Sequence, residues 1–138
     1  MSESTQVIRG GEFLIRETAA SEIFIPEEWT EEQLMMKQMT LDFVAQRILP
    51  ILDRIENQEE GLVPSLMEEA GELGLVGSSV PEIYGGLGLD FKTTMLITEA
   101  IGGAHSFSVS FSAHTGIGTL PILYYGNEAQ KQKWIPGL

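Results

Sequence analysis

The sequence has no cysteine and only two histidines, His105 and His114. Without cysteine, a disulfide scaffold, a zinc–thiolate site and a thiol nucleophile are all excluded. Two histidines are too few for a three-histidine metal site, so we expect no metal centre. No apolar run approaches the ~18 residues of a membrane span, and the first residues lack the basic start and apolar run of a signal peptide. These absences predict a soluble cytoplasmic protein without a membrane span.

Basic residues are also scarce, with 8 Lys and Arg against 20 Asp and Glu and a net charge of −12. Residues 1–75 hold 16 acidic and 5 basic side chains, whereas residues 76–138 hold 4 and 3 together with 10 of the 15 glycines. The acidic half would repel nucleic acid, which needs a basic surface, so we expect no nucleic-acid partner. The weakly charged half should be buried or covered by neighbouring protein.

Apolar residues recur with helical spacing along the chain of 138 residues, a length that fits one domain. One stripe predicts a long helix, which Pro50 should kink or break; it consists of Leu34, Leu41, Val44, Ile48, Leu52 and Ile55. Further helices are expected over 62–73, after a cap at Asp90, and after a cap at Asn127. The stripe and residues 94–123 should form the core. No segment reads as a convincing strand, so the fold class is all-α, with five or six helices.

Three segments in order carry a family resemblance: LGLVG at 73–77, PEIYGGLGL at 81–89 and PILYYGNEAQKQKWIP at 121–136. They resemble the N-terminal helical domain of acyl-CoA dehydrogenases, which typically reads LGLxG, P(E)xYGGxGL and G(T/N)xEQKxKYLP. Trp134 stands where tyrosine is usual, and Ile83 where glutamate is common. The segment FSAHTGIG looks most like the long- and very-long-chain members. The resemblance implies an orthogonal helical bundle over residues 30–138, after an N-terminal arm at 1–29.

The family resemblance also implies what the full-length protein does. Such enzymes use FAD to oxidise fatty acyl-CoA to trans-2-enoyl-CoA in fatty acid β-oxidation, and they pass electrons to electron-transfer flavoprotein or a similar acceptor. They are usually homo-oligomers. Their catalytic base and most of their FAD site lie in a central β-domain and a C-terminal helical domain, which we expect to be absent from this chain. We therefore assign no catalytic or cofactor-binding residue here and expect the 138-residue chain alone to be inactive.

Residues 106–125 contain no charged side chain and many small ones. In the resembled family this helix lines the tunnel that holds the acyl chain. Matching on Gly118 and Pro121 implies that Val109, Ala113 and Ile117 face the substrate, and close helix–helix packing is the alternative interpretation. We interpret His114 as a structural hydrogen-bonding residue, since no carboxylate lies nearby in sequence to make it an acid–base catalyst.

Smaller features have structural interpretations. We expect the Tyr84 phenol to bridge the glycine-rich loop to a helix, and Lys131 and Lys133 to lie on a solvated helix face or to steer CoA phosphates. Two alternatives to the dehydrogenase remain open from the sequence. One is a helical interaction module whose acidic half binds a basic partner, and the other is an acyl-chain binder without redox activity.

Overall fold

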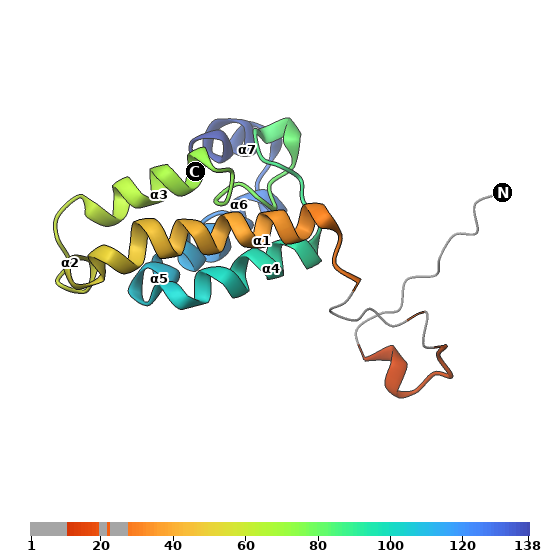
Figure 1. The fold of residues 1–138 in the computed structure, drawn as a ribbon. Coiled ribbons are helices and arrows are strands. Elements are labelled where there is room, and N and C mark those ends of the chain that lie inside the picture. Colours follow the sequence, from red (N-terminus) through yellow and green to blue (C-terminus); the bar gives the residue numbers. More distant parts are fainter. Residues whose placement is uncertain (1–10, 20–21, 23–27) are drawn as a thin grey trace. The chain divides into compact units, whose positions relative to one another are not determined.

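A computed structural model describes residues 11–19, 22 and 28–138 of the chain (Figure 1). The chain divides into two compact units, Met1–Glu31 and Glu32–Leu138. In the first unit, Glu12–Leu14 form a short 3-10 helix, and Arg16 makes ion pairs with Glu12 and Glu22. Much of the arm predicted over 1–29, including its apolar segment at 23–25, lies outside the described residues.

The second unit is built entirely from helices, and the described residues contain no strand. Its α-helices are α1 (Glu31–Phe43), α2 (Leu52–Glu56), α3 (Leu62–Glu72), α4 (Phe91–Ile101), α5 (Ser106–Ala113), α6 (Leu120–Tyr125) and α7 (Glu128–Trp134). A π turn and a 3-10 turn connect α1 to α2, and a π turn connects α5 to α6. These seven α-helices therefore form five continuous helical segments. This confirms the all-α prediction. No described helix combines the length and apolar character needed to cross a membrane.

The predicted break at Pro50 is present. After α1 the backbone forms a π turn at Val44–Ile48 and a 3-10 turn at Leu49–Ile51 before α2 begins. Proline has no N–H to donate to the preceding turn, so the hydrogen-bonding pattern changes around it. Ile51, with φ −121° and ψ 20°, is the residue at which the helix leaves regular geometry.

The core contains the second half of the predicted stripe but not the first. Val44, Ile48 and Ile55 are buried, whereas Leu34 is 48% and Leu41 40% exposed. The buried face of α1 instead carries Thr40 and Phe43, which lie on a different side of the helix from the two leucines. The remaining core comes from α3, α4, α5 and the segments that follow α3 and α4; it includes Leu66, Ala70, Leu75, Val76, Ile97, Ile101, Ala104, Phe107 and Phe111.

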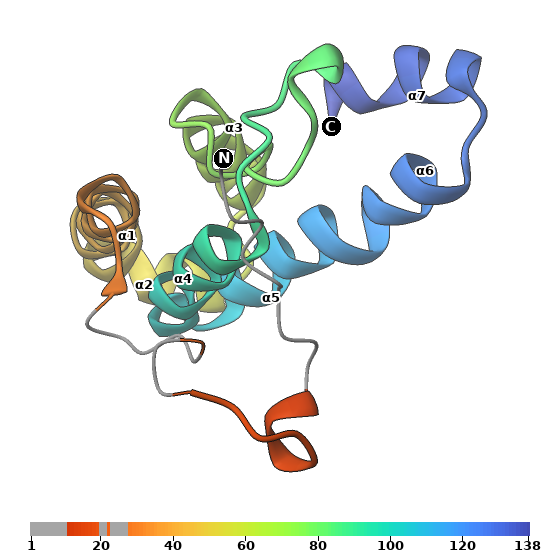
Figure 2. The ribbon, with the colours of Figure 1, turned by 90° about the vertical axis from the view of Figure 1, so that its right-hand side faces the viewer.

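Helices α1 and α4 lie side by side (Figures 1 and 2). Gln33 Nε2 donates to Thr93 Oγ1 at 3.0 Å, and Lys37 Nζ lies 3.3 Å from Glu99 Oε2. The predicted cap of α4 is confirmed, because the Asp90 carboxylate accepts the Thr93 N–H. These contacts fix α4 beneath α1 and so position the start of α5, which follows α4 after one short turn.

The glycine-rich loop between α3 and α4 folds back on itself at Gly86. The carbonyl oxygens of Gly77, Ser78 and Val80 accept hydrogen bonds from backbone N–H groups of residues 87–89. A Cβ placed on Gly86 would overlap the carbonyl oxygen and the Cβ of Val80. This close approach of two backbone segments explains why glycine is needed at Gly86.

Gly86→Ala should therefore destabilise the chain, by about 1–3 kcal/mol, because one of the two backbone segments must move. Gly71→Ala is the matched control, since Gly71 lies in α3 with open space around its Cα. There the same added methyl group should stabilise the helix by about 0.5–1 kcal/mol. Urea unfolding of both variants measures the two changes. Equal effects of the same sign would show that the loop does not close as described.

Candidate functional site

The candidate site is the continuous helical segment from α5 to α6. Between the two helices the backbone widens into a π turn at His114–Gly118. The Thr119 N–H and hydroxyl both donate to the His114 carbonyl, at 3.1 and 2.8 Å, and close that turn. Turns of this type are frequent at functional sites. Helix α6 then begins at Leu120, and Pro121 lies in its first turn, where a missing N–H costs no hydrogen bond.

The start of α5 is held by a carboxylate from another helix. The Ser106 N–H and Oγ donate to Glu56 Oε1 and Oε2 at 3.2 and 2.6 Å. These two hydrogen bonds, helped by nearby His105, lower the pKa of the Glu56 carboxyl. Since Glu56 ends α2, this contact joins the kinked first segment of the fold to the candidate site.

Glu56→Gln should lower the melting temperature at pH 7, because an amide has one acceptor oxygen where the carboxylate has two. The folded-state pKa of Glu56 is lowered, so its stabilisation is present above its ordinary pKa and is lost as the pH falls through the lowered value. The difference between wild type and variant should therefore shrink in acid. Melting curves from pH 7 to pH 3 measure it, with Glu60→Gln at an exposed position as control. A difference that does not change with pH would contradict this role.

The structure places the three predicted substrate-facing residues on one side of this segment. Val109 is 70% and Ile117 81% exposed, and Ala113 between them is half-buried. The opposite side of α5 carries Phe107 and Phe111, which are buried in the core and whose rings lie 6.4 Å apart. The apolar face of Val109, Ala113 and Ile117 therefore points away from the core of this unit. Nothing within the described part of the chain buries Val109 or Ile117.

At Nε2 of His114, the structural hydrogen bond that we expected is not seen with any described residue. Its Nε2 is buried and has no hydrogen-bond partner among the described residues. Sequence spacing gave no sign of this.

The glycine-rich loop is tied to α7 as predicted. The Tyr84 hydroxyl donates to both Glu128 carboxylate oxygens, at 3.1 and 2.9 Å, and Glu128 raises the pKa of that phenol. A capping box at Asn127 begins α7. Lys131 lies 3.5 Å from Glu128, and the Lys133 ammonium lies 4.4 Å from the ring centre of Trp134. Both lysines are thus engaged within their own helix, which favours the structural interpretation.

The described residues contain no cluster of three or more His, Asp or Glu side chains that could hold a metal ion. The candidate site is an apolar helix face formed by Val109, Ala113 and Ile117. Such a face can contact an aliphatic chain. It brings together no acid and base.

Comparison with known proteins identifies the family. The family model described as "Acyl-CoA dehydrogenase, N-terminal domain" matches residues 30–138. A probable acyl-CoA dehydrogenase of Bacillus subtilis is 46% identical over 136 residues, which are 99% of this chain and 23% of that protein.

Two solved structures are similar. An acyl-CoA dehydrogenase of Bacillus anthracis complexed with FAD matches 92% of this chain and 22% of its own, with 44% identity and a TM-score of 0.88. A structure described as the electron transferring flavoprotein of Acidaminococcus fermentans matches 81% of this chain and 30% of its own, with 29% identity and a TM-score of 0.69. The chain thus spans about a quarter of the length of the relatives it matches. It belongs to the acyl-CoA dehydrogenase family, and residues 30–138 correspond to the N-terminal domain of that family.

Proposed function

We propose that the full-length protein is an FAD-dependent acyl-CoA dehydrogenase that oxidises fatty acyl-CoA to trans-2-enoyl-CoA, and that this chain supplies one wall of the acyl-chain tunnel. The observation that carries the proposal is the uncovered apolar face of Val109, Ala113 and Ile117 in a chain of this family. An apolar helix face of this kind costs free energy while it contacts water. A fatty acyl chain, enclosed by the rest of the enzyme, would cover it.

Ala113 is the residue on which the tunnel depends most in this proposal. A methyl side chain leaves room for an aliphatic chain to lie close to the helix backbone, and Val109 and Ile117 extend the contact by one turn on each side. Each methylene moved from water to such a wall contributes about 0.8 kcal/mol. The wall therefore favours long acyl groups, which reach it, over short ones. This is the physical basis for proposing a preference for long-chain substrates.

FAD, when bound, would accept the hydride from Cβ while a base removes the proton from Cα. The exposed Tyr124 and Tyr125 rings at the end of α6 are apolar surface suited to contact another part of such an enzyme. As the family resemblance implies, the proposal places the base and most FAD contacts in a central β-domain and a C-terminal helical domain. The role proposed for this chain is to bind the substrate tail and exclude water from it.

The partners belong to the same proposal. We assign electron-transfer flavoprotein or a similar protein as acceptor and a homo-oligomer as the assembly of the full-length enzyme. The division into an arm at 1–29 and a helical domain at 30–138 is proposed with them. The cytoplasmic location stays a prediction from the sequence.

Anaerobic mixing of the purified full-length protein with palmitoyl-CoA tests the function. The proposal predicts a yellow protein whose flavin absorbance near 450 nm is lost on mixing, with palmitoyl-CoA converted to its trans-2-enoyl product. The 138-residue chain alone should be colourless and inactive. A full-length protein that binds palmitoyl-CoA without flavin would instead indicate an acyl-chain binder without redox activity. A full-length protein that binds neither would support an interaction module.

A further inference from the structure

The apolar face of α5 has a polar residue at its first position. Ser106, Val109 and Ala113 follow one another at steps of three and four, so the three residues lie on one face of the helix. With a rise of about 1.5 Å per residue, Ser106 lies roughly 4.5 Å beyond Val109 along the helix axis. An acyl chain that follows this face past Val109 therefore meets Ser106.

A carboxylate closes this end of the face. The Ser106 N–H and Oγ donate to the two Glu56 carboxylate oxygens, and Glu56 is held in place at the end of α2 because its neighbour Ile55 is buried in the core. The helix does not continue the face further, since His105 has φ 51° and ψ −129°, outside helical geometry. At Ala113, by contrast, the helical segment runs on through the π turn into α6. The face is thus closed at one end only.

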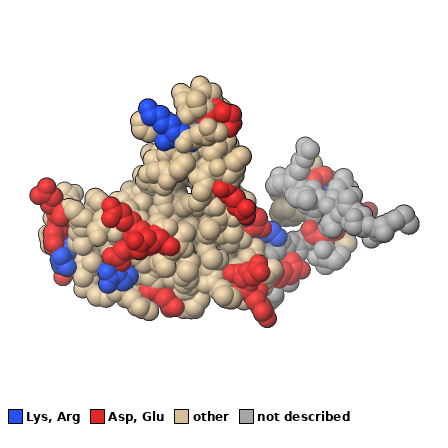
Figure 3. Space-filling model, turned by 90° about the horizontal axis from the view of Figure 1, so that it is seen from above, with Lys and Arg blue, Asp and Glu red and all other residues tan. Residues whose placement is uncertain are grey.

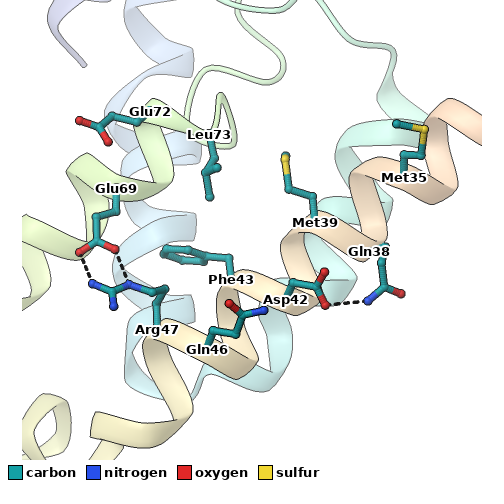
Figure 4. A pocket seen from close by; sticks show the side chains of 10 residues that line it. All are labelled: Met35, Gln38, Met39, Asp42, Phe43, Gln46, Arg47, Glu69, Glu72 and Leu73. Atoms are coloured by element: carbon teal, nitrogen blue, oxygen red, sulfur yellow. Dashed lines mark hydrogen bonds and ion pairs between the residues drawn. The ribbon is translucent and has the colours of Figure 1, made fainter.

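Glu56 keeps its charge without an ion pair to Lys or Arg. Acidic side chains lie beside basic ones on part of the face seen in Figure 3, and Figure 4 shows one such pair, in which Arg47 donates to both Glu69 oxygens at 2.6 and 2.9 Å. The hydrogen bonds that Glu56 accepts come from a neutral serine, and the ion pairs among the described residues do not include it. Because these hydrogen bonds lower the pKa of the Glu56 carboxyl, it is ionised at neutral pH.

We propose that Glu56, bound to Ser106, is a polar stop at the end of the acyl-chain tunnel and sets the longest acyl group that the full-length enzyme accepts. This inference rests on the proposed function and adds a residue that determines specificity. A terminal methyl group that reaches the stop must displace water from an ionised carboxylate, and a hydrocarbon cannot replace the lost hydrogen bonds. Acyl groups that end beside Val109 or earlier avoid that cost.

The test measures kcat/KM of the full-length protein for tetracosanoyl-CoA and palmitoyl-CoA. The wild type should prefer palmitoyl-CoA, whose shorter chain ends before the stop. Glu56→Gln removes the charge at nearly constant size, so the ratio of kcat/KM for tetracosanoyl-CoA to that for palmitoyl-CoA should rise roughly tenfold. A residue that only stabilises the fold would not change this ratio, because its loss would affect both substrates alike.

Ser106→Ala is the matched control. It removes the hydroxyl that donates to Glu56 and leaves the carboxylate in place, so it loosens the same contact without removing the charge. The ratio should not rise in this variant. Melting curves establish that both variants are folded at the assay temperature.

Three results would overturn the proposal: a wild type that oxidises both substrates equally well, a ratio that does not change in Glu56→Gln, or an equal rise in Ser106→Ala. The last would assign the length limit to the packing of α5 instead of the charge. A wild type that does not oxidise palmitoyl-CoA would refute the proposed function. The polar stop is then tested by the ratio of the Kd values for the two acyl-CoA molecules, which should shift in Glu56→Gln in the same direction; an unchanged ratio of Kd values would refute the stop as well.

Discussion

Replacing Ala113 by glutamate in the full-length protein should lower kcat/KM for palmitoyl-CoA by about two orders of magnitude and leave kcat/KM for butanoyl-CoA nearly unchanged. The new carboxylate would lie in an apolar tube, where losing its hydration costs several kcal/mol unless it takes up a proton. A long acyl chain would lose the space beyond Ala113, whereas a short one would not reach it. If about four methylenes lose their burial, the loss is roughly 3 kcal/mol, or about a hundredfold in rate.

The neighbouring Ser112 provides the control for this prediction. Ser112 is exposed and one position round the helix from Ala113, so Ser112→Glu adds the same charge to the same turn without entering the proposed tunnel. Its kcat/KM values should stay close to those of the wild type at every chain length. Losses of equal size for all substrates in Ala113→Glu would point to general misfolding. Wild-type rates in that variant would place Ala113 outside the pocket.

Ile48→Ala should lower the free energy of unfolding by about 2–5 kcal/mol. Ile48 is 0% exposed and belongs to the central cluster, so truncation leaves a cavity that close packing cannot refill. Leu41→Ala in the same helical segment should cost less than about 1 kcal/mol, because Leu41 is 40% exposed.

Urea unfolding of the chain followed by far-UV circular dichroism measures both free energies. The comparison is informative because the apolar stripe alone predicts equal burial of the two residues. Losses of similar size would mean that the Leu41 side of α1 packs as the stripe suggests, and the buried face described above would be wrong.

Local features of the fold were predictable from the sequence. The caps at Asp90 and Asn127, the break at Pro50 and the bounds of α7 depend on residues within a few positions of one another. Backbone geometry and one side-chain hydrogen bond determine each of them. A bridge from the Tyr84 phenol to a helix was also predicted. Its partner Glu128 could not be identified from the sequence, because 44 positions separate the two residues.

Features that depend on distant packing were not predictable in the same way. The stripe placed Leu34 and Leu41 in the core because a regular period assumes one buried face, but the buried residues of α1 are Thr40 and Phe43. The contact from Glu56 to Ser106 spans 50 positions and has no local pattern.

For the candidate site, the sequence identified the helical segment, and the structure shows which way its apolar face points. The family resemblance selected Val109, Ala113 and Ile117, and the structure shows that their shared face turns away from the core. The π turn at His114–Gly118 could not be read from sequence, because Gly116 and Gly118 are compatible with several helical geometries. The full tunnel needs walls from outside this chain, so its shape was beyond prediction from these residues.

Photoaffinity labelling tests the central claim most directly. The full-length protein is incubated with a palmitoyl-CoA analogue that carries a diazirine near the end of its acyl chain, irradiated and digested, and the labelled residues are located by mass spectrometry. If this chain forms the wall of the tunnel, the label lies within residues 109–117, excess palmitoyl-CoA prevents labelling, and an analogue with a four-carbon chain leaves these residues unlabelled. Labelling confined to residues outside 106–125, or labelling of 109–117 that palmitoyl-CoA does not prevent, would contradict the assignment.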